Sequence, residues 1–219
     1  MIEIKNLTKV FHSKDRDVIA LNEINLQVEE PNFVLIKGPS GCGKSTLLFS
    51  IAGMLRPSSG EIILNGKNIY GYSEKELLRF RARYIGFVYQ SYYLIPYLDV
   101  LDNIMLVNHS CGKVVTETEV VELAKQFKLE HRLHHKPSEL SVGEKQRVAF
   151  MRAIVVKPEL LLADEPTGNL DPENTQIIMN AFLDFRKHGG TVIMVSHGNE
   201  ADEYADIMVE MKEGKLAKA

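Results

Sequence analysis

The feature that most constrains the fold of this chain is a glycine-rich loop between two apolar segments. Residues 38–45 read Gly-Pro-Ser-Gly-Cys-Gly-Lys-Ser and fit the pattern Gly-x-x-x-x-Gly-Lys-Ser/Thr. The loop follows a segment typical of a buried strand, 33–37, and precedes a segment with helical spacing, 45–52. Glycines let backbone N–H groups curl around phosphate oxygens, and the start of the following helix attracts anions. The loop therefore predicts a P-loop nucleotide-binding core.

The residues of this loop have distinct expected roles. Lys44 is expected to reach the β- and γ-phosphates, and the Ser45 hydroxyl is expected to ligate Mg²⁺. A nucleoside triphosphate with Mg²⁺ is thus the predicted ligand. The expected nucleotide contacts are Gly38, Pro39, Ser40, Gly41, Cys42, Gly43, Lys44, Ser45 and Thr46.

A second apolar segment ends in two acidic residues. Residues 160–163 read Leu-Leu-Leu-Ala, and Asp164 and Glu165 follow them. At the end of a buried strand, Asp164 is placed to hold Mg²⁺, often through water. Glu165 comes one residue later, where a carboxylate can orient or deprotonate the water that attacks the γ-phosphate. Alone, this pattern is as typical of an ordinary strand that ends at the protein surface as it is of a magnesium site. Together with the glycine-rich loop, it predicts phosphate hydrolysis.

Hydrophobic patterning predicts an α/β fold. Short apolar segments alternate with segments of helical period, which indicates a mainly parallel sheet. Residues 2–10 and 20–28 alternate like antiparallel strands, so an antiparallel β layer is expected at the N-terminus. Further strands are expected at 33–37, 61–64, 85–89, 160–163, 192–195 and 207–211, with helices at 45–52, 100–107, 117–127, 143–156 and 175–185.

Two local signals refine this expectation. Ser73 followed by Glu76 predicts a capping box at a helix start, and Asn65-Gly66 predicts a hairpin turn. Between 91 and 156 the pattern is helical throughout. The expected organisation is a single domain, with a nucleotide-binding core and β layer in residues 1–90 and 157–219. Residues 91–156 form an inserted helical subdomain.

Composition limits the partners and the compartment. Of 219 residues 45% are hydrophobic, as in globular proteins, and the formal net charge of -3 argues against nucleic acid as a partner. Cys42 and Cys111 indicate reduced intracellular thiols rather than a disulfide framework. No segment reaches the roughly 18 apolar residues of a membrane helix, and the N-terminus lacks the apolar centre of a signal peptide. We expect a soluble, cytoplasmic chain.

Further motifs resemble the ATPase subunits of ABC transporters over nearly the whole chain. The match is close in residues 137–154 (PSELSVGEKQRVAFMRAI) and 163–171 (ADEPTGNLD). Residues 83–90, with 94–96 and 101–104, are similar to the lipoprotein-release and macrolide-export branch (LolD and MacB type), and the cell-division type FtsE is also similar. The resemblance implies a RecA-like P-loop core and ATP as the nucleotide.

The resemblance also implies roles for residues outside the first two motifs. Phe11 matches the aromatic residue that stacks on adenine, although a packed strand-end side chain is an alternative interpretation. Gln90 matches the glutamine that senses the metal and the γ-phosphate, and His197 matches the histidine that contacts the γ-phosphate. Asp171 matches a loop that communicates across a dimer, and an Asp before Pro172 is also typical of a helix cap. The implied catalytic residues are Glu165, His197, Lys44 and Gln90, and the implied metal ligands are Ser45, Gln90 and Asp164.

Residues 140–144, Leu-Ser-Val-Gly-Glu, match the family's signature segment with two departures. In the family this segment contacts the ATP of a second subunit, so Ser141 and Gly143 are implied ligands in a head-to-tail homodimer. Val142 stands where glycine is usual, and Glu144 where glutamine is usual. A β-branched residue hinders close approach of a ligand, and a carboxylate near nucleotide is repelled. We expect both departures to weaken ATP-driven dimerisation.

The implied function is an ATPase subunit that drives a membrane partner, peripheral on the inner face of the cell membrane. An integral permease would dock near residues 90–96, although the apolar residues 92–96 are also typical of a core. The alternative is a soluble ABC-type ATPase of a protein assembly machine, as in iron–sulfur cluster building (SufC type). Intact Lys44, Glu165 and His197 argue against a binding module without turnover.

Overall fold

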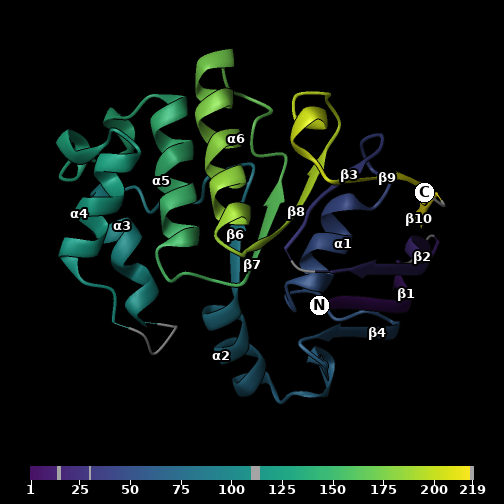
Figure 1. Cartoon of the computed structure of the whole chain (residues 1–219). Helices are drawn as coiled ribbons and strands as arrows, with labels where there is room; N and C mark the ends of the chain where they lie inside the picture. The colour runs from purple at the N-terminus through teal and green to yellow at the C-terminus, as the bar shows by residue number, and fades with distance from the viewer. Residues whose placement is uncertain (14–15, 30, 110–113, 218–219) are drawn as a thin grey trace.

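The computed structural model describes residues 1–13, 16–29, 31–109 and 114–217. Cys111, for which a reduced thiol is expected, lies outside these ranges, whereas Cys42 is a buried free cysteine. No helix in the described part of the chain is both long and apolar enough to cross a bilayer. Two sheets and their helices form the molecule (Figure 1).

The N-terminal strands form an antiparallel sheet, as the alternating pattern predicts. Its strand order is β2-β1-β4-β5, and every neighbouring pair is antiparallel. The Asn65-Gly66 turn joins the last two strands, which confirms the hairpin. The strands are β1 (Ile2–Phe11), β2 (Val18–Val28), β4 (Ser59–Leu64) and β5 (Lys67–Asn68).

The second sheet is mainly parallel and has the strand order β10-β9-β3-β8-β7-β6. Its neighbouring strands are parallel except for the pair of β9 and β10 at one edge. Because parallel strands end at the same edge of a sheet, residues that follow them gather there. The strands are β3 (Phe33–Lys37), β6 (Ile85–Val88), β7 (Leu160–Asp164), β8 (Thr191–Ser196), β9 (Ile207–Lys212) and β10 (Lys215–Leu216).

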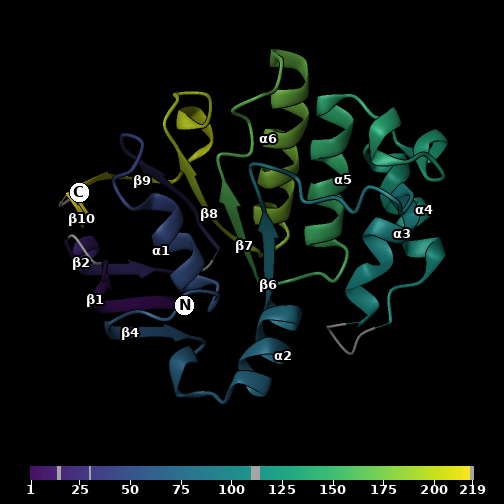
Figure 2. The same cartoon turned by 180° about the vertical axis from the view of Figure 1, so that it is seen from behind.

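Helices cover both faces of the parallel sheet. Helix α1 packs in one core with the antiparallel sheet and one face of the parallel sheet. Helices α5 and α6 lie side by side on the other face, with α3 and α4 beyond α5 (Figures 1 and 2). The helices are α1 (Lys44–Ile51), α2 (Glu74–Tyr84), α3 (Val100–Met105), α4 (Glu117–Gln126), α5 (Val142–Ile154) and α6 (Pro172–Lys187), with short 3-10 turns at Ile69–Gly71, Leu106–His109, Glu130–Arg132, Pro137–Glu139 and Asp202–Tyr204.

Capping residues set two of the helix starts. The capping box at α2 is confirmed, because Glu76 N donates to Ser73 Oγ and Ser73 N donates to Glu76 Oε2. Helix α6 begins at Pro172, three residues before the predicted start at 175. Asp171 caps it by accepting a hydrogen bond from Asn174 N at 2.9 Å, and Pro172 is suited to the first helical position.

Aromatic side chains join the helical layer to the sheet. The Phe150 ring of α5 meets the Phe182 ring of α6 edge-on, with centroids 4.8 Å apart. Phe182 also lies 6.1 Å from Phe33 of β3, and Phe150 lies 5.5 Å from Phe127 at the end of α4. Replacing one such buried phenylalanine with alanine typically costs about 3–5 kcal/mol of stability. This cluster therefore fixes α5 and α6 against the sheet.

Asp206 joins the amino end of β3 to the end of α6 through hydrogen bonds. Its Oδ2 atom accepts a hydrogen bond from Phe33 N, the first residue of β3, at 2.8 Å. Its Oδ1 atom accepts a hydrogen bond from Arg186, near the end of α6. One carboxylate thus joins the sheet to α6 at the edge opposite the glycine-rich loop.

Candidate functional site

The glycine-rich loop is held tightly between neighbouring backbone segments. Gly43 has φ 109°, in the region that favours glycine, and a Cβ atom there would lie 2.3 Å from Ala20 O. A Cβ atom at Gly38 would lie 2.2 Å from Met211 O. These two contacts explain why glycine is required at both ends of the loop.

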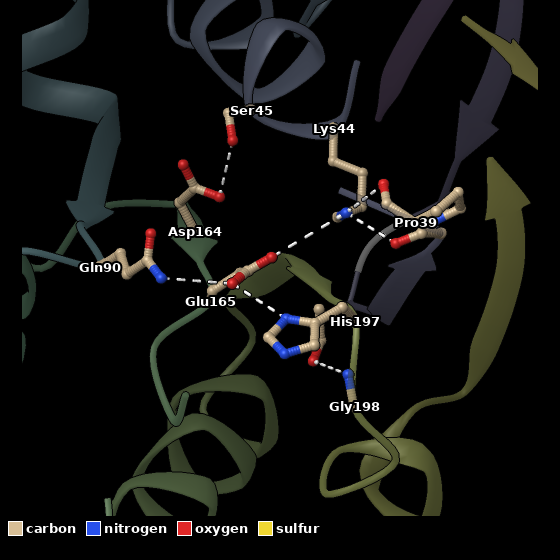
Figure 3. A network of polar contacts seen from close by, with 10 residues as sticks. Pro39, Lys44, Ser45, Gln90, Asp164, Glu165, His197 and Gly198 are labelled. Atoms are coloured by element: carbon tan, nitrogen blue, oxygen red, sulfur yellow. Dashed lines mark hydrogen bonds and ion pairs between the residues drawn. The ribbon is translucent and has the colours of Figure 1, made fainter. Parts of the chain in front are cut away.

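The Lys44 ammonium group lies inside this loop. It donates hydrogen bonds to Gly38 O at 2.7 Å and to Pro39 O at 3.0 Å (Figure 3). Its Nζ atom is also 3.9 Å from Glu165 Oε1, and the side chain is 5% exposed. A nearly buried cation therefore lies between the loop and the end of β7.

Ser45, at the start of α1, and Asp164, at the end of β7, are in direct contact. Ser45 Oγ donates to Asp164 Oδ1 at 3.1 Å (Figure 3). Burial raises the pKa of Asp164, and the charge of Glu165 adds to this effect, while the Ser45 hydrogen bond and Lys44 oppose it. A hydroxyl and a carboxylate oxygen are the hard donors that Mg²⁺ prefers, and a divalent cation would stabilise the ionised Asp164. The donor set fits magnesium.

Glu165 lies at the centre of the polar network. Its backbone is left-handed, with φ 46°, and its N–H donates to Val195 O of β8 at 3.0 Å. His197 Nδ1 lies 3.0 Å from Glu165 Oε2, and Gln90 Nε2 donates to the same oxygen at 3.3 Å (Figure 3). Because a carboxylate accepts only, the hydrogen lies on His197 Nδ1. Gln90, after β6, and His197, after β8, thus both contact the carboxylate of Glu165, which follows β7.

Phe11 lies apart from this network, at the end of β1. The alternative of a packed core residue is wrong, because Phe11 is 42% exposed. Its neighbour is Lys9, whose Nζ atom lies 5.2 Å from the ring centroid. The ring is accessible as a flat apolar surface.

Comparison with known proteins identifies the family. The family model described as ABC transporter matches residues 21–168. The chain belongs to the ABC transporter family. Among its relatives is the lipoprotein-releasing system ATP-binding protein LolD of Aquifex aeolicus, 40% identical over 99% of this chain and 96% of the relative.

Two further comparisons extend this finding. The macrolide export ATP-binding/permease protein MacB of Chlorobaculum tepidum is 37% identical over 98% of this chain, which covers 33% of MacB. A solved ATP-binding cassette, dimeric in a post-hydrolysis state with ADP and phosphate, superposes with a TM-score of 0.93. It is 33% identical, and the superposition covers 100% of this chain and 97% of that one. The predicted ABC-type α/β fold is therefore confirmed.

The signature segment of this ABC-transporter chain forms the start of α5. Ser141 Oγ accepts from Glu144 N at 3.2 Å, and Glu144 Oε2 accepts from Ser141 N at 2.7 Å. Val142 is 45% exposed beside them. Among the described residues, Ser141 and Asp171 make no hydrogen bond to the Glu165 network. The described hydrogen bonds of the Ser141 hydroxyl and N–H thus stay within the signature segment.

Glu144 has a counter-charge within the chain, which the expectation of a carboxylate that repels nucleotide did not include. Its Oε1 atom accepts a hydrogen bond from Arg132 Nε at 3.0 Å, in an ion pair within the chain. Burial alone would raise the pKa of Glu144, but hydrogen bonds from Ser141 and the Arg132 charge outweigh it and lower that pKa. The expectation overlooked Arg132, because an ion pair between a turn and a helix leaves no periodic trace in a sequence.

The segment after Gln90 is partly exposed and is held by α5 of this ABC-transporter chain. Tyr92 and Tyr93 have left-handed backbones, with φ 59° and 46°. Arg152 donates to Tyr92 O at 2.6 Å and to Tyr93 O at 2.7 Å. None of residues 92–96 is fully buried. Leu94 packs against the core, as the core interpretation expects, whereas Tyr93 and Pro96 are exposed.

Proposed function

We propose that this chain hydrolyses ATP and, as a head-to-tail dimer around two ATP molecules, drives a membrane partner of the lipoprotein-release or export type. One observation carries the proposal. The Glu165 carboxylate lies beside Lys44 and is held by His197 and Gln90. A general base must be fixed within reach of the attacking water, and this network fixes it.

Each side chain of the network has a proposed task. Glu165 accepts the proton of the attacking water, and His197 orients Glu165 through its Nδ1–H. Lys44 leaves its loop carbonyls to neutralise the β- and γ-phosphates. Positioned general bases contribute typically 10²–10⁴-fold to a rate. Replacing Glu165 should therefore lower hydrolysis by at least about a hundredfold.

Ser45 and Asp164 would hold Mg²⁺. The Gln90 amide donates its hydrogen to Glu165, so its Oε1 atom stays available as a further metal ligand. When bound, the ion supplies charge neutralisation at the phosphates. The geometry that supports this assignment is the 3.1 Å contact between Ser45 Oγ and Asp164 Oδ1.

The remaining expected nucleotide contacts are Phe11 and the residues that would face a second copy of the chain. The exposed Phe11 ring would stack on adenine. Ser141, Gly143 and Asp171 would contact the ATP and the loop of a second copy, as the dimeric form of the solved relative supports. The core would comprise residues 1–90 and 157–219, and the helical subdomain residues 91–156.

The membrane partner would dock near residues 90–96. Tyr93 is 64% exposed and Tyr97 is 73% exposed, which is unusual for large aromatic side chains. A neighbouring groove of about 280 Å³ is lined by Phe87, Arg152 and other residues of α2, β6, α5 and the 3-10 turn Leu106–His109. The names of the LolD and MacB relatives support a transporter subunit over the assembly-machine alternative. As a transporter subunit, the chain would lie on the inner face of the cell membrane. Copurification with membranes would decide between the two.

The decisive experiment compares Glu165→Gln with wild type by gel filtration with ATP and Mg²⁺, and by phosphate release. We expect the variant to form an ATP-dependent dimer and to lose hydrolysis. Glu61→Gln, an exposed change on β4, is the matched control and should behave like wild type. A persistent monomer with undiminished turnover would overturn the proposal.

A further inference from the structure

The starts of α5 and α6 interlock at a single side chain, Asn174. A Cβ atom added at Gly143 would lie 2.3 Å from both Cγ and Oδ1 of Asn174. Gly143 belongs to the signature segment, and Asn174 lies one turn after Asp171 on α6. A side chain at position 143 would therefore displace the Asn174 amide, quite apart from any ligand.

The Asn174 amide uses both of its polar atoms to join two charged residues. Its Nδ2 atom donates to Asp171 Oδ2 at 2.6 Å. Its Oδ1 atom accepts a hydrogen bond from Arg147 Nη1 of α5. Asp171 Oδ1 also accepts from Asn174 N at 2.9 Å. The side chain thus connects the carboxylate at the start of α6 with the guanidinium group of α5.

The charges around this bridge reinforce it. Burial lowers the pKa of Arg147, while Glu144, Asp171 and Glu173 oppose that shift. Hydrogen bonds from the backbone and side chain of Asn174 lower the pKa of Asp171. The lowered pKa favours the ionised form of Asp171, and arginine stays protonated in proteins. The amide thus bonds two charged groups, and such hydrogen bonds are the stronger kind.

The bridge spans the two proposed parts of the chain. Helix α5 belongs to the helical subdomain and α6 to the core, and their signature and Asp171 segments are the ones proposed to meet a second copy. Two segments that must contact one partner together bind more tightly when their relative position is fixed beforehand, because less conformational freedom is lost on binding.

We propose that Asn174 is a positioning residue that fixes the signature segment relative to the Asp171 segment, so that a second copy of this chain meets both in one arrangement when ATP drives dimerisation. This inference rests on the proposed function, since it requires the head-to-tail dimer.

The test measures dimerisation in the Glu165→Gln background by gel filtration over a range of ATP concentrations. Asn174→Ala should need at least about ten times more ATP for half-maximal dimerisation, which corresponds to about 1.4 kcal/mol. The affinity of the monomer for a fluorescent ADP analogue should change less than twofold, because Asn174 makes no bond to the phosphate loop. Asn180→Ala, an exposed change farther along α6, is the control.

A second pair of variants separates positioning from a general loss of stability. Gly143→Ala should weaken dimerisation in the presence of Asn174, because the added methyl group collides with it. In the Asn174→Ala background the same change should have a smaller effect, because the collision with Asn174 is removed and only the proposed contact of Gly143 with the second copy's ATP is left to disturb. Equal effects of Gly143→Ala in both backgrounds would overturn the inference, as would an ATP midpoint for Asn174→Ala within twofold of Asn180→Ala.

Asn174→Asp covers the case in which the alanine variant does not fold. It keeps an acceptor for Arg147 but loses the donor to Asp171, so we expect a similar rise in the ATP midpoint. A midpoint unchanged from the parent would overturn the role of the Asp171 contact. If Glu165→Gln itself does not dimerise while the chain still binds nucleotide, the proposed function fails and this inference fails with it.

Discussion

Arg132→Ala would leave the Glu144 carboxylate without its guanidinium partner. The Glu144 side chain is 13% exposed and that of Arg132 is 33% exposed, so the pair is partly shielded from water. Hydrogen bonds to charged groups contribute about 1.5–3 kcal/mol, and a shielded charge that loses its partner is costly. We expect Arg132→Ala to lower the free energy of unfolding by about 2 kcal/mol. For a chain of this size that is roughly 4–8 °C in Tm.

Glu144→Gln should cost less, about 1 kcal/mol, because glutamine keeps an oxygen for the cap and Arg132 reaches solvent. In the double variant the two losses should not add, and the coupling energy should be about 1–2 kcal/mol. Urea unfolding followed by circular dichroism measures all three variants. Glu130→Gln, an exposed change in the same 3-10 turn as Arg132, is the control. Losses that add within about 0.5 kcal/mol would show that the pair contributes nothing.

The same pair determines which signature departure affects turnover. Because Arg132 already neutralises Glu144, we expect Glu144→Gln alone to leave the ATPase rate per chain unchanged. Val142→Gly should then account for any gain of the combined Val142→Gly/Glu144→Gln variant. Phosphate release at saturating ATP measures the rates. A faster Glu144→Gln enzyme would mean that the carboxylate does face nucleotide.

Two further predictions concern the ends of β6 and β7. Asp164→Asn should raise the Tm at pH 7 while abolishing Mg²⁺-dependent hydrolysis, because a raised pKa means that the ionised carboxylate opposes folding above that pKa. The gain should shrink as the pH falls and the wild-type carboxyl becomes protonated, and calorimetry that finds no gain at pH 7 would contradict this reasoning. Arg152→Ala removes both donors to the Tyr92 and Tyr93 carbonyls, so hydrogen exchange in that loop should accelerate by about 5–30-fold, the equivalent of roughly 1–2 kcal/mol. Exchange as slow as in wild type would show that the loop keeps its conformation without Arg152.

Local motifs made most of the fold and the centre of the site predictable. The loop from Gly38 to Ser45 and the acidic pair at the end of β7 are contiguous in sequence, and their chemistry follows from residue type. Parallel strands end at one edge, so the meeting of Glu165 and His197 followed from strand order and needed no contact information.

The contacts that escaped prediction all join segments distant in sequence or depend on exposure. Arg132 pairs with Glu144 across a turn, and Arg147 reaches Asn174 on another helix. Neither contact follows a helical or strand period, so patterning has no means to find it. The strand pattern also could not predict that Phe11 is exposed, because the side chain of the last residue of a strand can face either the core or the solvent.

Asp206 contributes to stability at a place remote from the groups proposed to hydrolyse ATP. It joins β3 and α6 at the amino ends of the strands, whereas Glu165 and the glycine-rich loop lie at the carboxyl ends. The described hydrogen bonds of Asp206 go to Phe33 and Arg186 and to no member of the Glu165 network, so a substitution there acts on this junction and not directly on that network. Substitutions at this edge of the sheet therefore offer a way to change the melting temperature of the chain without altering the groups proposed to act on ATP at the other edge.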